Sequence, residues 1–243
     1  MIEVIVIWLS IILLFPILIV VTLSILKTSL LIVLLVAIFY MEDTKELIQS
    51  AKDHDPAAKR SIEILVTYQG IHAIILHRLA HRLSKHMSLI SRMVSNYNRW
   101  ITGIEIHPDA EIGKKIFIDH GMGIVIGETA VIGQNCHLYQ GVTLGGTSTK
   151  REKRHPTLKN NVTIGAGAKL IGNITIGENA KVGAGAVVIS NVPDNATVVG
   201  VPAHIVAFFQ DDNETIEKLP DPGWDRINEL ERQIKEIQEK IDK

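Results

Sequence analysis

Residues 158–188 read LKNNVTIGAGAKLIGNITIGENAKVGAGAVV, and an aliphatic residue returns at every sixth position of this stretch. A period of six is neither the 3.6 of an amphipathic helix nor the two of a half-buried strand. It is typical of a β-helix, in which each hexapeptide supplies one short strand and three hexapeptides make one triangular coil. Each coil covers its core only by stacking on the next. The same period runs through residues 106–188 in three phases, which are Ile106, Ile112, Ile118 and Ile124, then Ile126, Ile132, Leu138 and Leu144, then Leu158, Ile164, Leu170, Ile176, Val182 and Val188.

Two interruptions of the repeat carry polar and charged residues. The register slips by two residues at 124–126, shortly after Asp119-His120-Gly121. The step from Leu144 to Leu158 is more than two hexapeptides long, so a loop must leave the β-helix there, and this loop carries Arg154-His155. Binding residues commonly sit on loops held by a rigid scaffold. Both interruptions are therefore candidate sites, and tolerated loop variation is the alternative.

The composition excludes several classes of protein. The chain has 243 residues, enough for one or two domains, and a net charge of −1, which gives no electrostatic case for binding nucleic acid. The single cysteine, Cys136, excludes an internal disulfide framework and fits a reducing compartment.

Residues 1–41 are expected to form a membrane segment. Lys27 is the one charged residue between Val4 and Tyr40, and as a helix this stretch would reach roughly 55 Å, longer than the roughly 30 Å hydrocarbon core of a bilayer. A single span could occupy Val4–Leu26, or the stretch could form a hairpin turning near residues 27–29. The basic residues that follow place the downstream domain on the cytoplasmic, inner face of the cell membrane; they are Lys45, Lys52, Lys59 and Arg60. The alternative is a soluble protein that starts at Met41.

Residues 42–102 are expected to form a helical domain. Apolar residues recur there at helical spacing, and Pro56 suits the start of a helix. His77 and His81 lie four residues apart, as two metal ligands on a helix would, but no third ligand accompanies them, so we expect boundary histidines and no metal.

Residues 210–243 are expected to form a polar linker, over 211–222, and then a helix with a heptad pattern. Isoleucine at both core positions of a heptad favours trimers or tetramers. A single amphipathic helix folded onto its own subunit is the alternative. The apolar positions are Ile227, Leu230, Ile234, Ile237 and Ile241.

Several strings in residues 103–209 resemble the serine O-acetyltransferases, a family of hexapeptide-repeat acyltransferases. They are Gly-Ile-Glu-Ile-His-Pro at 103–108, Phe-Ile-Asp-His-Gly at 117–121, Gly-Val-Thr-Leu-Gly-Gly-Thr at 141–147, Arg-His-Pro at 154–156, Gly-Ala-Gly-Ala-Lys at 165–169 and Val-Val-Gly-Val-Pro-Ala at 198–203. The resemblance covers about residues 42–209 and includes Asp55-Pro56-Ala57. It implies an α+β chain with a left-handed parallel β-helix over residues 103–209, assembled as a homotrimer or a dimer of trimers. It also implies transfer of acetyl from acetyl-CoA to the hydroxyl of L-serine, which gives O-acetylserine for cysteine biosynthesis.

Acetyl transfer from a thioester to a hydroxyl needs a base, an orienter for that base and donors for the developing oxyanion. His120 is the candidate base, because a neutral imidazole titrates near neutral pH. The resemblance places the acidic orienter at Glu105, where many family members have the shorter aspartate. It assigns to His155 a role in positioning substrate or stabilising the oxyanion.

The resemblance also implies a site for serine. Asp55 and Asp119 would face the ammonium group, and Arg154 would pair with the substrate carboxylate, which a planar guanidinium fits well. A helix N-cap is the alternative for Asp55, and exposure in the basic loop 150–154 is the alternative for Arg154. We expect His137, which belongs to no matched string, to have no part in the site.

Acetyl-CoA is expected in a groove along the β-helix between neighbouring subunits. Small residues there would let the pantetheine arm approach backbone amides, at Gly146, Ala166 and Ala184, with Lys181 near the phosphate end. Plain corner packing is the alternative for the three small residues. No metal is implied, and Cys136 is expected to be a packed residue.

Three other functions stay open from the sequence. The chain could acetylate a sugar or an antibiotic, could be a non-catalytic scaffold tethered to the membrane, or could be a zinc hydratase, although no suitably spaced histidine pair occurs in the β-helix. Asp55, Asp119 and Arg154 favour an amino-acid zwitterion over a neutral sugar. Some family members bind O-acetylserine sulfhydrylase through a terminal isoleucine; this chain ends Ile241-Asp242-Lys243, so no stable complex of that kind is expected.

Overall fold

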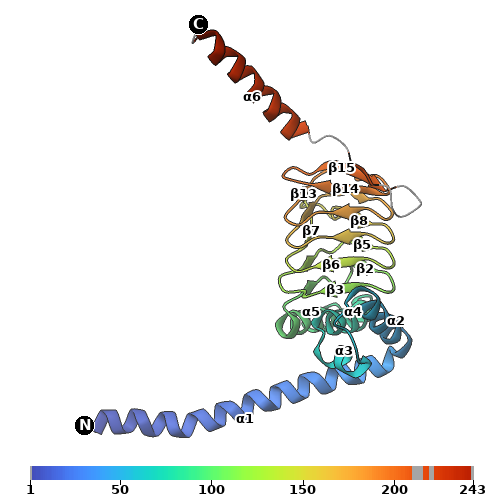
Figure 1. Cartoon of the computed structure of the whole chain (residues 1–243). Coiled ribbons are helices and arrows are strands. Elements are labelled where there is room, and N and C mark those ends of the chain that lie inside the picture. The colour runs from blue at the N-terminus through green and yellow to red at the C-terminus, as the bar shows by residue number, and fades with distance from the viewer. Residues whose placement is uncertain (1, 210–215, 219–221, 242–243) are drawn as a thin grey trace.

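The computed structural model describes residues 2–209, 216–218 and 222–241 (Figure 1). A long helix at the N-terminus leads into a small helical domain, the helical domain covers one end of a β-helix, and a last helix extends from the other end (Figure 1). The helices are α1 (Ile2–Phe39), α2 (Met41–His54), α3 (Ser61–Thr67), α4 (Gln69–Ser84), α5 (Ser88–Thr102) and α6 (Pro222–Ile241).

The predicted parallel β-helix is confirmed: its strands stack in parallel on three faces. The first face has the order β1-β4-β7-β10-β13, with β1 at Glu105–Ile106, β4 at Val125–Ile126, β7 at Thr143–Gly145, β10 at Lys169–Ile171 and β13 at Val187–Val188. The second face has the order β2-β5-β8-β11, with β2 at Glu111–Ile112, β5 at Val131–Ile132, β8 at Thr157–Leu158 and β11 at Thr175–Ile176. The third face begins β3-β6-β9-β12-β14, with β3 at Phe117–Asp119, β6 at His137–Tyr139, β9 at Thr163–Ile164, β12 at Lys181–Val182 and β14 at Ala196–Val199.

The register of the strands shows what the two interruptions of the repeat do. In a regular coil, paired positions are three hexapeptides apart in the sequence, as Ile164 and Val182 are. The slip at 124–126 lengthens the first coil, so Ile106 pairs with Ile126. The loop before Leu158 lengthens the second coil further, and Leu138 pairs with Ile164. The aliphatic positions of all three phases are at most 9% exposed, so the extra residues bulge outward while the core remains continuous.

Three corners join the faces, and their names are used below. The first-to-second corner contains residues 107–110, 127–130, 146–156 and 172–174. The second-to-third corner contains residues 113–116, 133–136, 159–162 and 177–180. The third-to-first corner contains residues 120–124, 140–142, 165–168 and 183–186.

Each coil has one residue with a left-handed backbone conformation where the second face turns into the third, and in most coils this residue is asparagine. Asparagine tolerates positive φ better than most residues because its short side chain bonds locally. The Asn135 amide donates to Asn161, and Asn161 donates in turn to Asn179, at 2.9 and 3.0 Å. The other members of this column are Lys115 at its start and Asn195 at its end.

The helical domain is fixed to the first coil by side-chain bonds to backbone carbonyls. Ser95 Oγ donates to the Ile106 carbonyl at 2.6 Å, and Ser50 Oγ donates to the Lys115 carbonyl at 2.9 Å. Gly70 allows the closest approach, because a Cβ there would lie 2.4 Å from the Ile118 carbonyl oxygen. The start of α4 is therefore held beside the end of β3.

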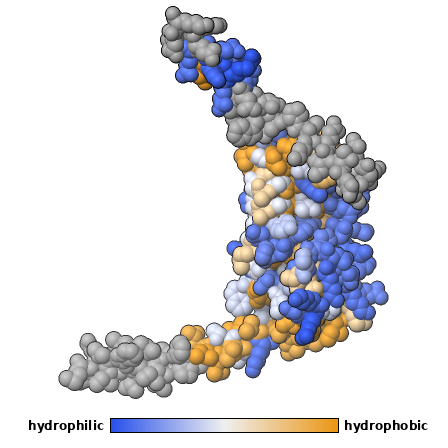
Figure 2. All heavy atoms as spheres, viewed as in Figure 1, coloured by the Kyte–Doolittle hydropathy of each residue, from blue (hydrophilic) through white to orange (hydrophobic). Residues whose placement is uncertain are grey.

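Helix α1 is one continuous helix of 38 residues, so the hairpin alternative is wrong. Among the residues whose side chains are described, one segment, Ile17–Ile38, is long and apolar enough to cross a membrane. The first part of the Val4–Leu26 span considered from the sequence lies outside those residues. Ser29, Val33 and Ala37 are buried, and α1 packs against α4. Figure 2 shows the described part of α1 as an apolar surface along the base of the molecule.

The C-terminal part begins with two antiparallel strands that close the third face. Strand β15 (His204–Phe209) pairs with β14, and β16 (Ile216–Lys218) pairs with β15, so part of the range expected as linker is a strand. Helix α6 extends away from the β-helix (Figure 1). Leu230, Ile234 and Ile237 are 42–57% exposed, so these side chains do not pack on their own chain as the folded-back alternative requires.

Candidate active site

A cavity of about 240 Å³ joins the helical domain to the third-to-first corner. Its walls include Asp55 and Tyr68 from the helical domain, and Asp119 and His120 from the end of β3. Three residues predicted as site residues therefore share one cavity, although Asp55 and Asp119 lie far apart in the sequence. Two carboxylates and an imidazole around a polar cavity suit an ammonium group beside a hydroxyl that must lose a proton.

His120 lies in an unusual backbone conformation at the corner. Its φ is +59°, in the left-handed region that is uncommon for residues other than glycine, although asparagine, aspartate and histidine adopt it more often than the rest. Its side chain is 74% exposed, and Nε2 lies 3.8 Å from an Asp119 carboxylate oxygen. Strained backbone of this kind clusters at functional sites, and here it holds the imidazole outward, away from the aliphatic core.

Asp55 is oriented by two hydrogen bonds. The Tyr68 hydroxyl donates to Oδ2 at 2.6 Å, and the Ala57 backbone N–H donates to Oδ1 at 2.7 Å. The Tyr68 bond, followed by the Ala57 bond, lowers the pKa of Asp55, and the Asp55 carboxylate raises the pKa of Tyr68 to about 12. The carboxylate is thus ionised and aimed into the cavity at neutral pH.

The expectation that Pro56 starts a helix is wrong. Asp55 is the C-terminal cap of α2, and α3 begins only at Ser61, with Arg60 as its N-cap residue. The bond from Ala57 closes a local turn on the aspartate side chain, which is the geometry by which aspartate stabilises turns. The N-cap alternative for Asp55 is therefore excluded.

Glu105 lies one coil below the residues that follow His120. Its backbone N–H donates to the Ile124 carbonyl at 2.9 Å, and Gly123 N–H donates to the Gly103 carbonyl at 2.9 Å, so these segments run side by side. The Glu105 carboxylate forms an ion pair with Arg99 at 3.1 Å. Within the described part of the chain no hydrogen bond or ion pair joins Glu105 to His120, and their pairing stays a prediction.

A second cluster of predicted residues occupies the first-to-second corner. Arg154 Nη2 lies 2.6 Å from Glu128, and Nη1 donates to the Ser148 carbonyl at 3.1 Å. The Arg154 bond lowers the pKa of Glu128. The guanidinium is thereby held at the corner by a carboxylate on the coil below, in a partly buried position.

His155 is 6% exposed and fixed in one tautomer. The Thr129 backbone N–H points at Nδ1 from 3.1 Å, so Nδ1 accepts and the proton of the neutral ring is on Nε2. Burial, followed by the charge of Arg154, lowers the pKa of His155 and keeps the ring neutral. A neutral ring with Nε2–H is a hydrogen-bond donor suited to a carbonyl oxygen that gains negative charge.

Gly127 and Gly146 make room for that ring. A Cβ on Gly127 would lie 2.1 Å from His155 Cδ2, and one on Gly146 would lie 3.0 Å from His155 Nε2. Gly146, predicted as a cofactor-binding residue, thus lies against Arg154 and His155.

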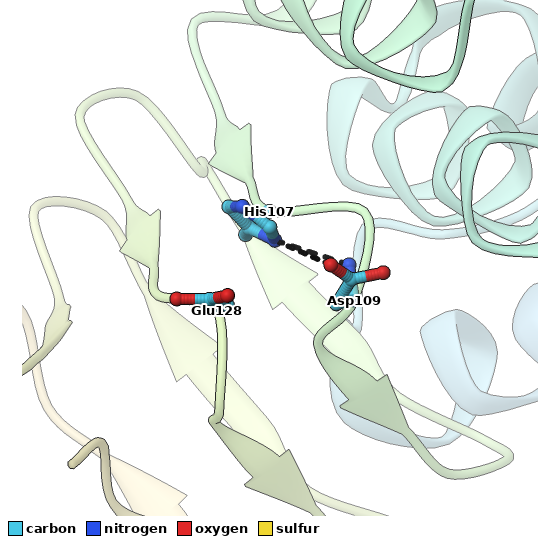
Figure 3. A group of neighbouring side chains, drawn as sticks. All are labelled: His107, Asp109 and Glu128. Carbon is cyan, nitrogen blue, oxygen red and sulfur yellow. Dashed lines mark hydrogen bonds and ion pairs between the residues drawn. The ribbon is translucent and has the colours of Figure 1, made fainter. Parts of the chain in front are cut away.

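His107, Asp109 and Glu128 gather at the same corner and could offer ligand atoms to a metal ion (Figure 3). Their ligand atoms lie within 4.8 Å of one another. Asp109 N–H donates to His107 Nδ1 at 3.1 Å, and Arg154 already pairs with Glu128. A guanidinium bonded to one of three ligands repels a cation, so the group fits the role of balancing the charge of Arg154 better than that of a metal centre.

Two of the remaining predicted cofactor residues, Ala166 and Ala184, lie on the His120 corner, in later coils. Ala166 and Ala184 precede Gly167 and Gly185, which have φ of +71° and +69° and open space where a Cβ would be. The backbone N–H of Gly185 donates to the Ala166 carbonyl at 2.8 Å, so the coils stack directly. Small residues therefore line this corner above His120. Lys181 lies on β12, with Nζ 3.9 Å from the centre of the Phe209 ring.

The two clusters lie at different corners of the same chain. His120 stands at the start of the first face and His155 at its end, and a strand and its turn separate them. Among the described contacts none joins His120, Asp55 or Asp119 to Arg154 or His155. One chain therefore presents two half-sites.

Comparison with known proteins identifies the family. A model for bacterial transferase hexapeptide repeats (six repeats) matches residues 155–190. The serine acetyltransferase of Bacillus subtilis (strain 168) is 49% identical over 204 residues, which cover 82% of this chain and 93% of the relative. The chain belongs to the serine acetyltransferase family.

Solved serine acetyltransferases have the same fold. The crystal structure of the Neisseria gonorrhoeae enzyme in complex with serine has a TM-score of 0.67 and 42% identity over 69% of each chain. A serine acetyltransferase in complex with cysteine has a TM-score of 0.67 and 42% identity, over 68% of this chain and 69% of that one.

Sequence reasoning missed three residues of this serine acetyltransferase family member: Tyr68, Glu128 and Thr129. Tyr68 stands in a helical pattern, where an aromatic residue indicates packing. Glu128-Thr129 follows an in-phase Ile126-Gly127, where the repeat predicts only a corner. Their roles depend on contacts with Asp55, Arg154 and His155, which are distant in the sequence and which no local pattern indicates.

Proposed function

We propose that this chain is a serine O-acetyltransferase, which transfers acetyl from acetyl-CoA to the L-serine hydroxyl to give O-acetylserine. The observation that carries the proposal is the cavity that unites Asp55, Asp119 and His120 at an outward, left-handed corner. The family membership supports it, since relatives at 47–49% identity are serine acetyltransferases. O-acetylserine is the expected product for cysteine biosynthesis.

The chemistry follows from these positions. The His120 imidazole accepts the proton of the serine hydroxyl while the oxygen attacks the thioester carbon. The new C–O bond gives a tetrahedral oxyanion, whose collapse breaks the C–S bond. The imidazolium then returns its proton to the departing CoA thiolate. Glu105 is the proposed orienter of His120, a role that requires its carboxylate to leave the ion pair with Arg99.

Serine carries an ammonium group and a carboxylate, and each half-site supplies partners for only one of these two groups. Asp55 and Asp119 supply negative charge for the ammonium group, but no Lys or Arg accompanies them among the described residues that line the cavity. Arg154 supplies a guanidinium for the carboxylate, and His155 supplies the Nε2–H donor. Because these two residues lie at another corner of the same chain, the proposed site is completed by Arg154 and His155 of the partner subunit.

A trimer fits this requirement, since a heterologous interface repeated three times joins unlike surfaces in a closed ring. The exposed apolar positions of α6 support a coiled-coil trimer at the far end of the left-handed β-helix, and a dimer of trimers is compatible with it. The proposed acetyl-CoA groove runs along the third-to-first corner over Ala166 and Ala184, with Gly146 contributed from the partner subunit's first-to-second corner and Lys181 near the phosphate end.

We also propose that α1 anchors the enzyme to the inner face of the cell membrane, with the β-helix in the cytoplasm. The length and apolar character of Ile17–Ile38, a segment of 22 residues, support this placement. Extraction of membranes with carbonate tests it: the anchored protein stays in the pellet, and a peripheral one appears in the supernatant.

The test of function is a substrate panel with a thiol reagent that detects released CoA. L-Serine should release CoA from acetyl-CoA, whereas amino sugars and aminoglycoside antibiotics should not. The His120→Ala variant is the matched negative control. Release of CoA with a sugar and not with serine would show that the enzyme acetylates a sugar instead. No release with any acceptor would favour a non-catalytic scaffold tethered to the membrane.

A further inference from the structure

A larger cavity, of about 680 Å³, lies at the second-to-third corner and has no part in the site described above. It opens between the end of α1, the second half of α4 and the turn after β2. Four side chains with a permanent positive charge line it, namely Arg78, Arg82, Lys85 and Lys114, together with His81 and His86.

The charge of this cavity is strongly one-sided. Among the described residues that line it, Asp43 is the single carboxylate, which leaves a surplus of three positive charges from the arginines and lysines alone. Glu46 forms an ion pair with Lys114 from outside the lining, at 3.2 Å, and reduces the surplus to two. A cavity with this balance attracts an anion, particularly one with more than one charge or several acceptor oxygens.

The dipole of α4 explains only some of the basic side chains that line this cavity. Cations at the C-terminal end of a helix are stabilised by its negative end, which accounts for Arg82 in the last turn of α4 and for Lys85 at its C-cap. It does not account for Lys114, which comes from the β-helix. Arg78 is fixed by bonds to the carbonyls of Ile112 and Gly113, and its Nε, 3.6 Å from Asp43, is buried without a hydrogen-bond partner. The positive charge thus comes from two parts of the fold, and Arg78 is the member of the group that these bonds hold in place.

The cavity lies beside the end of the candidate membrane span, and this position favours a ligand found at a membrane surface. Tyr40 lines it and lies just beyond the candidate span Ile17–Ile38. Tyrosine is enriched at membrane interfaces. On the proposed anchoring of α1, the cavity therefore lies next to the end of the span, close to the membrane surface.

We propose that this juxtamembrane cavity binds a phosphate-bearing anion. Its chemistry fits the phosphodiester of an acidic phospholipid headgroup, and the same groups would hold free phosphate. The volume exceeds that of a single phosphate and has room for a headgroup such as phosphoglycerol. The inference that the anion belongs to a lipid headgroup depends on the proposed anchoring of α1. The inference that the cavity binds a phosphate group does not depend on it.

The test uses the full-length protein in a maltoside detergent, which carries no phosphate. Thermal unfolding is followed during titration with dioleoylphosphatidylglycerol, with zwitterionic dioleoylphosphatidylcholine, or with inorganic phosphate against chloride at equal ionic strength. The variant is Lys85→Ala with Lys114→Ala. The matched control is Lys59→Ala with Arg60→Ala, which removes two positive charges from exposed positions outside the cavity.

We expect phosphatidylglycerol to raise the unfolding temperature of the wild type more than phosphatidylcholine does. A basic side chain near anionic lipid contributes about 1 kcal/mol, or about fivefold in affinity, so the cavity variant should bind about 25-fold more weakly and the control should match the wild type. A response to phosphatidylglycerol alone identifies the lipid as the source, and an equal response to inorganic phosphate identifies a soluble ligand.

The proposal is overturned if neither phosphatidylglycerol nor inorganic phosphate raises the unfolding temperature of the wild type. It is also overturned if the control variant loses as much affinity as the cavity variant does. Serine-dependent CoA release by the same preparations is a separate readout. It should be unchanged in the cavity variant, because none of the proposed catalytic groups lies at this corner. Unfolding of the variants without ligand shows whether they fold as the wild type does.

Discussion

Replacement of Gly127 by alanine tests the role of His155 without altering any proposed catalytic group. The added Cβ would lie 2.1 Å from His155 Cδ2, whereas ordinary van der Waals contact begins at 3.4 Å. The imidazole must therefore shift by the difference between these two distances or rotate away. Gly127 does not have a positive φ, so the backbone itself tolerates alanine.

The expected magnitude follows from that displacement. A misplacement of about 1 Å can cost roughly 100-fold in rate, and loss of one oxyanion donor costs about 100- to 1000-fold. Gly127→Ala should thus lower kcat of serine-dependent CoA release by about 100-fold, and by no more than His155→Ala does. The KM for acetyl-CoA should change little.

The matched control is Gly145→Ala in the neighbouring strand. Its Cβ would lie 3.0 Å from Ile171 Cδ1, the movable end of an aliphatic side chain, and would not touch His155. It should keep kcat within a few-fold of the wild type. A Gly127→Ala enzyme that folds normally and turns over at the wild-type rate would refute the reasoning that places His155 at the reaction.

Three further predictions test other parts of the site and fold. His120→Ala should lower kcat by roughly 100- to 10,000-fold, the range of a general base, with an unchanged far-ultraviolet circular dichroism spectrum; near-normal turnover would remove His120 from the role of base. Arg154→Lys should raise the KM for serine by about tenfold, because lysine lacks the planar pair of donors, while the KM for acetyl-CoA stays constant; an equal change in both constants would contradict a specific carboxylate contact. Thermal stability should fall as the pH is lowered from 6.5 towards 4, because burial lowers the pKa of His137 to about 4, so the unfolded chain gains its proton before the folded one does. His137→Asn should make this dependence less steep, with His77, whose pKa burial lowers to about 3, contributing to the remainder; an unchanged slope would assign the acid sensitivity to other groups.

The sequence was sufficient for the β-helix because its signal is periodic and redundant. Each of the aliphatic positions repeats the same information, and loss of one would not hide the period. The interruption before Leu158 marked the loop that carries Arg154 and His155 for the same reason, since a break is visible only against a regular repeat.

The geometry of the site could not be predicted from the sequence, because no repeat reports the contacts between side chains. The turn at Asp55-Pro56 resembles a helix start by composition, but the side chain of Asp55 bonds to Ala57 and Tyr68, and α3 begins only at Ser61. The pairing of Arg154 with Glu128 depends on the length of the enlarged coil that separates them in the sequence. Such contacts follow from the stacking of coils and not from any local pattern.

The most direct test of the composite site is complementation between two inactive variants. His120→Ala and His155→Ala chains carrying different affinity tags are co-expressed, and trimers that contain both are purified through the two tags in turn. If each site combines His120 of one chain with His155 of its neighbour, the closed ring of a mixed trimer has one site in three with both residues intact. Serine-dependent CoA release should then recover to about a third of the wild-type rate. Mixed trimers as inactive as either parent would show that the two half-sites do not meet across subunits.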